Sequence, residues 1–305
     1  MASLRHRAAV TLVEILVVMA IIGILIAILV PAVQRVRNAA AQTECTNKMK
    51  QIATALHSYH DANKQFPPAL SLNTSDSWYL SWMGRILPFV DNDPMATEIT
   101  KEYTRVNSPW GNFWLPAWGG QPPHVGLSES PAIFRCSSEG RAMTMSVMLG
   151  TGNAADAGFT SYLGVHGSDD TAADGILVVG ARITMNSITD GSSSTLMVGE
   201  RPPSKDMGYG MWYAGAGYDG NGTGDVVLGA RSTPFTTKLT CPPTKVGLQS
   251  GNVNDSCSQS HFWSHHSGGS NFAFADGTVR FLTYAADAKL QALATRNSGD
   301  DATVE

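Results

Sequence analysis

The sequence lacks any stripe of basic residues. Its 21 Lys and Arg are dispersed among 305 residues, and with 25 Asp and Glu they leave a formal net charge of −4. Proteins that bind nucleic acid usually concentrate Lys and Arg on one face, because contacts to phosphate supply much of their affinity. We therefore expect no nucleic-acid partner.

Cysteine is scarce, and none of the four cysteines belongs to a C-x-x-C pair. A zinc ribbon is therefore not expected. Cys241 and Cys257 flank a loop rich in Pro, Gly and Asn, which a disulfide would stabilise by about 3 kcal/mol in the chain-entropy model. Cys45 and Cys136 remain, either as a second disulfide that ties a helix to the rest of the chain or as two buried thiols.

Signatures of catalysis are also missing, since the chain contains neither G-x-S-x-G nor H-E-x-x-H. The candidates for a metal site or a hydrolase pair are His261, His265, His266 and Asp276. We favour a structural interpretation, in which His266 hydrogen-bonds a loop. Apolar residues alternate on both sides of Asp276 and Gly277, which predicts a β-hairpin with a tight turn.

Other potential metal ligands are sparse. His57 and His60 are three residues apart on a predicted helix beside Asp61, which we interpret as a polar helix face. The acidic stretch at residues 169–174 lacks the D-x-D-x-D-G pattern of a calcium loop, and a calcium site there is the weaker alternative. We expect no metal, no cofactor and no enzymatic activity.

Long helical patterns are rare after residue 65, where Gly and Pro are frequent, and this composition predicts a loop-rich β body. Residues 77–90 are expected to form an apolar helix or strand. Residues 133–136 are expected to form a short strand, and residues 160–180 a hairpin. Residues 183–203 are expected to form two strands joined by an Asp-Gly turn.

An uninterrupted apolar run is present near the N-terminus, where the nineteen residues from Ile15 to Val33 carry no charge. As a helix this run is roughly 30 Å long, enough to cross the hydrocarbon core of a bilayer. It is too long for the apolar region of a secretory signal peptide. A plain membrane anchor would leave the Glu14 carboxylate at the membrane edge, at a cost on the order of 1–3 kcal/mol.

The helical pattern continues beyond the apolar run as an amphipathic stripe, which ends at the sequence Phe-Pro-Pro at residues 66–68. The stripe consists of Met49, Ile52, Ala53, Leu56 and Tyr59. We divide the chain into a leader at residues 1–9, a transmembrane and assembly helix with an amphipathic stalk at 10–66, and a β-rich head at 67–305 with a short C-terminal helix.

The segment R-x-A-A-V-T-L-V-E-I-L resembles the N-terminus of type IV prepilins and pseudopilins. The resemblance implies cleavage between Ala9 and Val10, methylation of Val10, and pairing of Glu14 with the terminal ammonium group of a neighbouring subunit. It also implies that the helix loosens at Gly23 and kinks at Pro31. The family usually has Gly before the cut and Phe after it, and this chain has Ala and Val.

Four ordered segments extend the resemblance over nearly the whole chain. They are TECTNKMKQIATALHSYHDANKQFPP, FRCSSE, TDGSSSTLMVGE and HHSGGSNFAFADGTVRFL, and they resemble the pilin-like family of domain of unknown function 1559. That family implies a membrane-inserted, processed protein without an established activity. Its expected fold is α+β, with a long N-terminal helix packed on a loop-rich antiparallel β-sheet head.

We interpret the chain as a structural subunit of a pilus- or pseudopilus-type filament. Its expected partners are identical or related subunits, a prepilin peptidase and, before assembly, membrane lipid. The expected location is the bacterial inner membrane, with a single pass and the head in the periplasm or outside the cell. One alternative is an adhesin-like head that captures polysaccharide through the three Trp of residues 108–124. The other is an enzyme that uses the His cluster.

Overall fold

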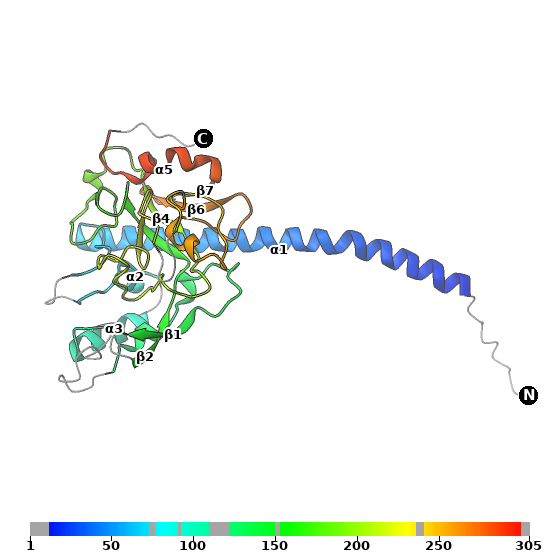
Figure 1. The fold of residues 1–305 in the computed structure, drawn as a ribbon, viewed down its shortest axis with the longest axis horizontal. Coiled ribbons are helices and arrows are strands. Elements are labelled where there is room, and N and C mark those ends of the chain that lie inside the picture. The colour runs from blue at the N-terminus through cyan, green and yellow to red at the C-terminus, as the bar shows by residue number, and fades with distance from the viewer. Residues whose placement is uncertain are drawn as a thin grey trace, which may run out of the picture.

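The computed structural model describes residues 12–72, 77–90, 93–109, 122–149, 153–235 and 241–299. One long helix, α1 (Leu12–Asn63), dominates the molecule. Its C-terminal half lies within a head of β-strands and short helices, whereas its N-terminal half projects from the head (Figure 1). This arrangement confirms the predicted α+β class with a long N-terminal helix packed on a β-sheet head.

The C-terminal half of α1 is part of the core of the head. Ala55 and five further residues are fully buried there, and these five recur at three- and four-residue spacing, so they share one face of the helix: Cys45, Met49, Ile52, Ala53 and Leu56. Four of these five belong to the stripe predicted from the sequence. The helix ends at Asn63, just before the Phe-Pro-Pro sequence that cannot extend it.

The main sheet of the head has five strands in the order β5-β3-β4-β6-β7. Their bounds are β3 (Tyr162–Gly167), β4 (Leu196–Glu200), β5 (Val227–Gly229), β6 (Gly269–Phe274) and β7 (Val279–Thr283). β6 and β7 form the hairpin predicted around Asp276 and Gly277. Neighbouring strands are antiparallel except β3 and β5, which pair in parallel at one edge, so the sheet is mixed rather than purely antiparallel.

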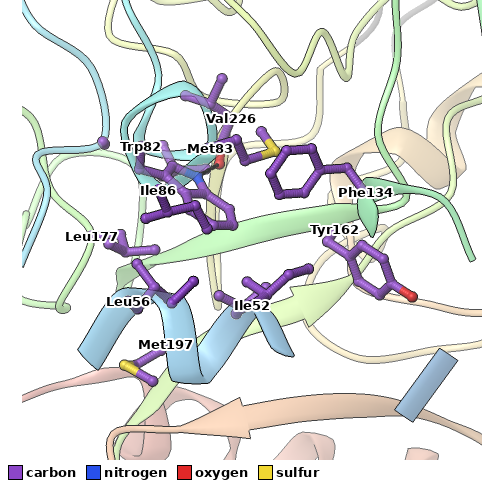
Figure 2. Packing of buried hydrophobic residues seen from close by; sticks show 14 of the residues in the cluster. Ile52, Leu56, Trp82, Met83, Ile86, Phe134, Tyr162, Leu177, Met197 and Val226 are labelled. Carbon is purple, nitrogen blue, oxygen red and sulfur yellow. Dashed lines mark hydrogen bonds between the residues drawn. The ribbon is translucent and has the colours of Figure 1, made fainter. Parts of the chain in front are cut away.

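The sheet lies between two helices. One face packs on α1, whose Ile52 and Leu56 lie close to Met197 and Tyr162 (Figure 2). The opposite face carries Phe272 and Phe274 and packs on the C-terminal helix α5 (Asp287–Ala294). Alternate residues of a strand face opposite sides of a sheet, so both faces of this sheet can be apolar and buried.

Shorter elements complete the head beside the C-terminal half of α1. They are α2 (Trp82–Ile86), α3 (Asp93–Arg105), α4 (Val125–Ser128) and the antiparallel pair β1 (Thr144–Leu149) and β2 (Asn153–Gly158). For residues 77–90 the helical alternative is confirmed, because α2 is followed directly by a 3-10 helix at Leu87–Phe89. The β1–β2 pair was not anticipated from the sequence.

Three local predictions are wrong. The expected strand at residues 133–136 is a 3-10 helix at Ala132–Phe134. Residues 160–180 contain only β3, because the apolar run at 176–178 is buried without entering a sheet ladder and instead hydrogen-bonds residue 69. Residues 183–203 contain one strand, β4, and the first half is a 3-10 helix at Met185–Ser187.

Candidate functional site

The N-terminal half of α1 presents large apolar side chains on all sides. Between Leu12 and Val36 these side chains are between 44% and 75% exposed. The helix is long and apolar enough to cross a membrane, and none of its most apolar window is buried in the described part of the chain. Such a surface requires lipid or other protein around it, because exposed apolar area is unfavourable in water.

Three of the predicted assembly residues lie in this projecting half. Glu14 lies in the first turn of α1, where a carboxylate interacts favourably with the helix dipole. A Cβ atom at Gly23 would meet no described atom within 4 Å apart from its chain neighbours and the nearby backbone of α1. Pro31 lies inside the helix, which continues on both sides of it. The predicted cleavage residues Ala9 and Val10 lie outside the described residues.

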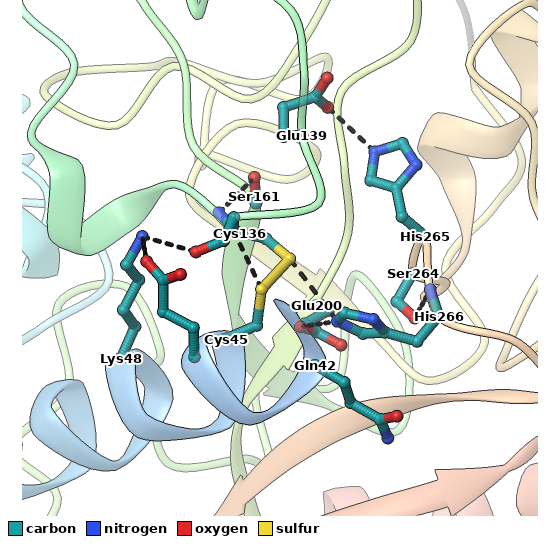
Figure 3. Close-up of a disulfide and its surroundings, with 12 residues drawn as sticks. Gln42, Cys45, Lys48, Cys136, Glu139, Ser161, Glu200, Ser264, His265 and His266 are labelled. Atoms are coloured by element: carbon teal, nitrogen blue, oxygen red, sulfur yellow. Dashed lines mark hydrogen bonds and ion pairs between the residues drawn. A yellow bond between two sulfur atoms is a disulfide. The ribbon is translucent and has the colours of Figure 1, made fainter. Parts of the chain in front are cut away.

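A disulfide joins the helix to the head where α1 enters it. Cys45 on α1 is bonded to Cys136, which follows the 3-10 helix, and their Cα atoms are 5.0 Å apart (Figure 3). The backbone N–H of Ser137 donates a hydrogen bond to the Cys45 sulfur at 3.0 Å. The Lys48 ammonium donates to the carbonyl oxygen of Arg135 at 3.0 Å. The end of the 3-10 segment is therefore held to α1 by covalent and polar contacts.

The second disulfide lies away from the helix. It joins Cys241 and Cys257, whose Cα atoms are 5.6 Å apart and which are sixteen residues apart in the sequence. Lys245, within the enclosed loop, forms an ion pair with Asp255 at 2.9 Å. The structure therefore contains the predicted Cys241–Cys257 bond and, for Cys45 and Cys136, the disulfide rather than the two thiols.

A buried carboxylate and a histidine lie beside the Cys45–Cys136 disulfide. Glu200 at the end of β4 is 1% exposed, and its Oε2 accepts hydrogen bonds from the backbone and side-chain N–H groups of Asn271 at 2.7 and 3.1 Å. His266 Nε2 is 3.5 Å from Glu200 Oε1 and 3.6 Å from the Cys136 sulfur (Figure 3). The sequence placed His266 against a loop, whereas its ring lies between β4 and the disulfide. The Cys45–Cys136 disulfide, Glu200, Asn271 and His266 are called the junction below.

Glu139 forms a separate ion-paired cluster next to the junction. Its carboxylate accepts two hydrogen bonds from the Arg141 guanidinium at 2.6 Å and is 3.1 Å from His265 Nε2. Burial favours the neutral acid, but the hydrogen bonds from Arg141 and His265 outweigh it and lower the pKa of Glu139 to about 2. His265 therefore faces a carboxylate different from the one beside His266.

The remaining candidate histidines serve local packing. His57 lies beside Gly277 in the β6–β7 turn, and burial lowers its pKa. His60 Nε2 accepts a hydrogen bond from the backbone N–H of Met185 at 3.3 Å. Burial lowers the pKa of His261 to about 4, and its Nδ1 lies 3.2 Å from the carbonyl oxygen of Phe262. Asp276 accepts hydrogen bonds from Thr278, as expected in a tight turn.

The acidic stretch considered for calcium has internal partners. The Asp174 carboxylate accepts hydrogen bonds from the backbone N–H and the hydroxyl of Ser168, both at 2.7 Å. Asp169 accepts from the backbone N–H groups of Thr171 and Ala172. These bonds order the loop after β3. The three Trp of the proposed polysaccharide loop, at residues 110, 114 and 118, lie outside the described residues.

Sequence reasoning missed Glu200 and Asn271 as parts of the junction and Glu139 as the centre of the cluster beside it. Glu200 carried a usable signal, because a carboxylate that directly follows the apolar strand sequence LMVG is positioned for burial. Such a carboxylate requires partners. Its partners, however, come from β6 and from the segment before it, and only the tertiary structure brings these together.

Comparison with protein families gives two matches. Residues 34–289 match the family described as "Protein of unknown function (DUF1559)". Residues 4–30 match the "Prokaryotic N-terminal methylation motif". The chain shows no significant similarity to a curated protein or to a solved structure.

Proposed function

Because this chain belongs to the DUF1559 family and carries the prokaryotic N-terminal methylation motif, we propose that it is a filament subunit that assembles through α1. The motif makes it a type IV pilin-like protein that is processed at its N-terminus and anchored in a membrane. The proposal adds that the processed subunit leaves the bilayer for a pilus- or pseudopilus-type fibre, where other subunits replace lipid around the helix.

The exposed apolar half of α1 carries this proposal. Ile24, Ile28 and Val36 are more than 60% exposed, and they lie on a helix that also carries the core of the head. Burying one Ile side chain contributes about 1.5–3 kcal/mol, so leaving many exposed in water is strongly unfavourable. Lipid covers such a surface before assembly, and the helices of neighbouring subunits cover it afterwards.

Glu14 supplies the specific contact in the proposed fibre. We propose that the leader is cleaved between Ala9 and Val10, which creates an ammonium group at Val10. A carboxylate excluded from water needs a charged or hydrogen-bonding partner. The ammonium group of an adjacent subunit provides one and sets the axial register of the two helices.

The firm attachment of the head supports a structural role. The Cys45–Cys136 disulfide and the buried face of α1 fix the head to the helix at the point where the helix leaves it. A tensile force along the helix is therefore transmitted to the core of the head. We place the subunit in the bacterial inner membrane before assembly, with the head outside the cytoplasm, where disulfides persist.

Two other functions receive less support. Capture of polysaccharide depends on Trp residues outside the described part of the chain. An enzyme would need its candidate residues gathered in one cleft. The three His of residues 261–266 instead have separate partners: His261 contacts a backbone carbonyl, and His265 and His266 contact two different carboxylates. We therefore propose a non-enzymatic role.

The test compares Glu14→Ala with Glu44→Ala in cells. Glu44 is also on α1 but is exposed and pairs with Lys48 four residues away, so its loss controls for removal of a helix carboxylate. We expect both variants to insert in the membrane. Only Glu14→Ala should be depleted from fibres sheared off the cell surface.

Intact-mass analysis of the same membrane fractions tests processing. A mature chain that begins at Val10 supports the proposed cleavage, and a chain that retains residues 1–9 contradicts it. Equal amounts of the wild-type protein and Glu14→Ala in sheared fibres would overturn the role of Glu14. Absence of the wild-type protein from these fibres would overturn the assembly proposal itself.

A further inference from the structure

Four buried side chains from four segments converge where α1 enters the head. They are Cys45 on α1, Cys136 after the 3-10 helix, Glu200 on β4 and His266 before β6. One sulfur, nitrogen or oxygen atom from each lies within 4.8 Å of the corresponding atoms of the others. These four residues are between 0% and 7% exposed. Two sulfurs, an imidazole nitrogen and a carboxylate oxygen form a ligand set that zinc accepts.

Two of the spacings in this cluster fit a tetrahedral ion. Zinc bonds of 2.0–2.3 Å place neighbouring ligand atoms of a tetrahedron about 3.3–3.8 Å apart. His266 Nε2 is 3.5 Å from Glu200 Oε1 and 3.6 Å from the Cys136 sulfur. The disulfide occupies the remaining two positions. Once that bond is open, rotation of the two cysteine side chains, whose Cα atoms are 5.0 Å apart, would separate their sulfurs.

The Glu200 carboxylate is an independent indication of a ligand. Its Oε1 is buried and has no hydrogen-bond partner among the described residues, whereas Oε2 accepts hydrogen bonds from Asn271. The His266 imidazole faces Oε1 with its Nε2 3.5 Å away, which is too far for a good hydrogen bond. The asymmetry matches a metal-binding carboxylate, in which one oxygen is oriented by protein hydrogen bonds and the other faces the ion.

A backbone group supports the thiolate form of Cys45. The N–H of Ser137 donates to the Cys45 sulfur at 3.0 Å, and this donor would stabilise negative charge on the sulfur after the disulfide is opened. Thiolates rather than thiols bind zinc. A hydrogen bond to a coordinating sulfur is a typical outer contact of a metal site.

We propose that the dithiol form of this junction binds a zinc ion through Cys45, Cys136, Glu200 and His266. The newly made chain carries both cysteines as thiols, so no reductant is required. Binding releases the two thiol protons and transfers no electrons. When a protein disulfide of an oxidising compartment later accepts two electrons from the two sulfurs, the Cys45–Cys136 bond forms. The ion then leaves, because the two sulfurs of the disulfide are no longer thiolates.

A groove borders the junction on the side of His266. It has a volume of about 700 Å³ and is lined in part by Gln42 of α1, Ser137 and Ser138 next to Cys136, and His266. His266 therefore borders both the groove and the buried cluster. Zinc bound there would hold α1 to the head before the disulfide does, at the same pair of sulfurs.

The test uses the full-length protein in detergent, reduced anaerobically with a phosphine and incubated with zinc. After desalting, we expect one zinc ion per reduced chain and none in the oxidised chain. Cobalt in place of zinc should give the absorption of a tetrahedral cobalt-thiolate centre. A chain with Cys241→Ser and Cys257→Ser should behave as wild type, which assigns the ion to the other cysteine pair.

Matched variants separate ligands from their neighbours. His266→Gln and Glu200→Gln should weaken zinc binding by at least about tenfold to a hundredfold, whereas His265→Gln should leave it unchanged. Competition with a chromophoric chelator measures these changes. A reduced wild-type chain that retains no zinc, whether folded or unfolded, would overturn the proposal. Equal affinities of wild type, His266→Gln and Glu200→Gln would also overturn it, even if zinc stayed bound.

Discussion

Ile24 and Ile52 belong to the same uninterrupted helix, yet the first is 61% exposed and the second is fully buried. Around Ile24 the apolar side chains point in all directions. Around Ile52 they occupy one face, and this face contacts the sheet and α2 (Figure 2). The two halves share a backbone conformation and differ in what surrounds them.

This difference shows that helix α1 has two separate sources of stability. The C-terminal half is stabilised within one chain by packing, a disulfide and polar contacts to the head. The N-terminal half depends on an environment outside the chain, because its apolar surface remains exposed. Changes in the first half should therefore alter the stability of the head, whereas changes in the second should alter insertion and assembly.

Removal of the disulfide at the junction should have the largest effect. Cys45 and Cys136 are separated by 91 residues, and in the chain-entropy model their bond stabilises by about 4.5 kcal/mol. Cys241 and Cys257 are separated by 16 residues, which corresponds to about 3 kcal/mol. Paired Cys→Ser variants in detergent, unfolded with guanidinium and followed by Trp fluorescence, measure both values. A larger loss at Cys241–Cys257 would contradict the special role of the junction.

Truncation of one side chain in each half tests the comparison directly. Ile52→Ala removes a fully buried side chain and should lower the free energy of unfolding of the head by about 2–5 kcal/mol. Ile24→Ala removes a side chain that is not part of the core, and it should change the free energy of unfolding of the head by less than about 0.5 kcal/mol. The same guanidinium titration measures both variants. Equal losses would mean that the projecting half also stabilises the head.

The ion pair of Glu139 with Arg141 tests how much a buried charge contributes to the stability of the head. Its pKa of about 2 lies below the ordinary value of 4.5, so its stabilisation is fully present above about pH 4.5 and is lost as the pH falls towards 2. Glu139→Gln should therefore lower stability at pH 7 by about 2–3 kcal/mol, and by much less near pH 2. Urea unfolding across this pH range measures the difference between the two proteins.

Glu44→Gln is the matched control for that pH profile. Glu44 pairs with Lys48 on the surface of α1, with 58% of its side chain exposed, and exposed pairs contribute little. Its profile should follow that of the wild type. If the difference in stability between the wild type and Glu139→Gln stays constant between pH 7 and pH 2, ionisation of Glu139 is not its cause.

The sequence predicted the elements whose pattern is local. The apolar run and the stripe at Met49, Ile52 and Leu56 define α1, since helical periodicity reports which face is buried. The β6–β7 hairpin followed from alternation around an Asp-Gly turn. The apolar run at 176–178 was misassigned, because a buried run has the same composition whether it pairs in a sheet or packs as irregular chain.

Most of the junction could not be predicted, because its partners are far apart in the sequence. Its pairs are separated by 91 residues for Cys45 and Cys136 and by 71 for Glu200 and Asn271. The sequence left Cys45 and Cys136 open between a disulfide and two thiols, and it assigned His266 to a hydrogen bond with a loop. Only the packing of α1 against β4, β6 and the 3-10 helix at Ala132–Phe134 brings them together, and no local pattern encodes these contacts.

The smallest expected effect concerns Gly23 in the projecting half. Apart from its two chain neighbours and the nearby backbone of α1, no described atom lies within 4 Å of a Cβ placed there, so Gly23→Ala meets no steric obstacle in the single subunit. Ala is favoured over Gly inside a helix by about 0.8–1 kcal/mol. The substitution should therefore slow amide exchange near Gly23 severalfold in detergent while the unfolding of the head stays the same. If Gly23→Ala instead weakens fibre assembly, a neighbouring helix approaches closely at Gly23, since the isolated subunit leaves that space open. Unchanged assembly together with slower exchange would limit the role of Gly23 to local loosening of α1.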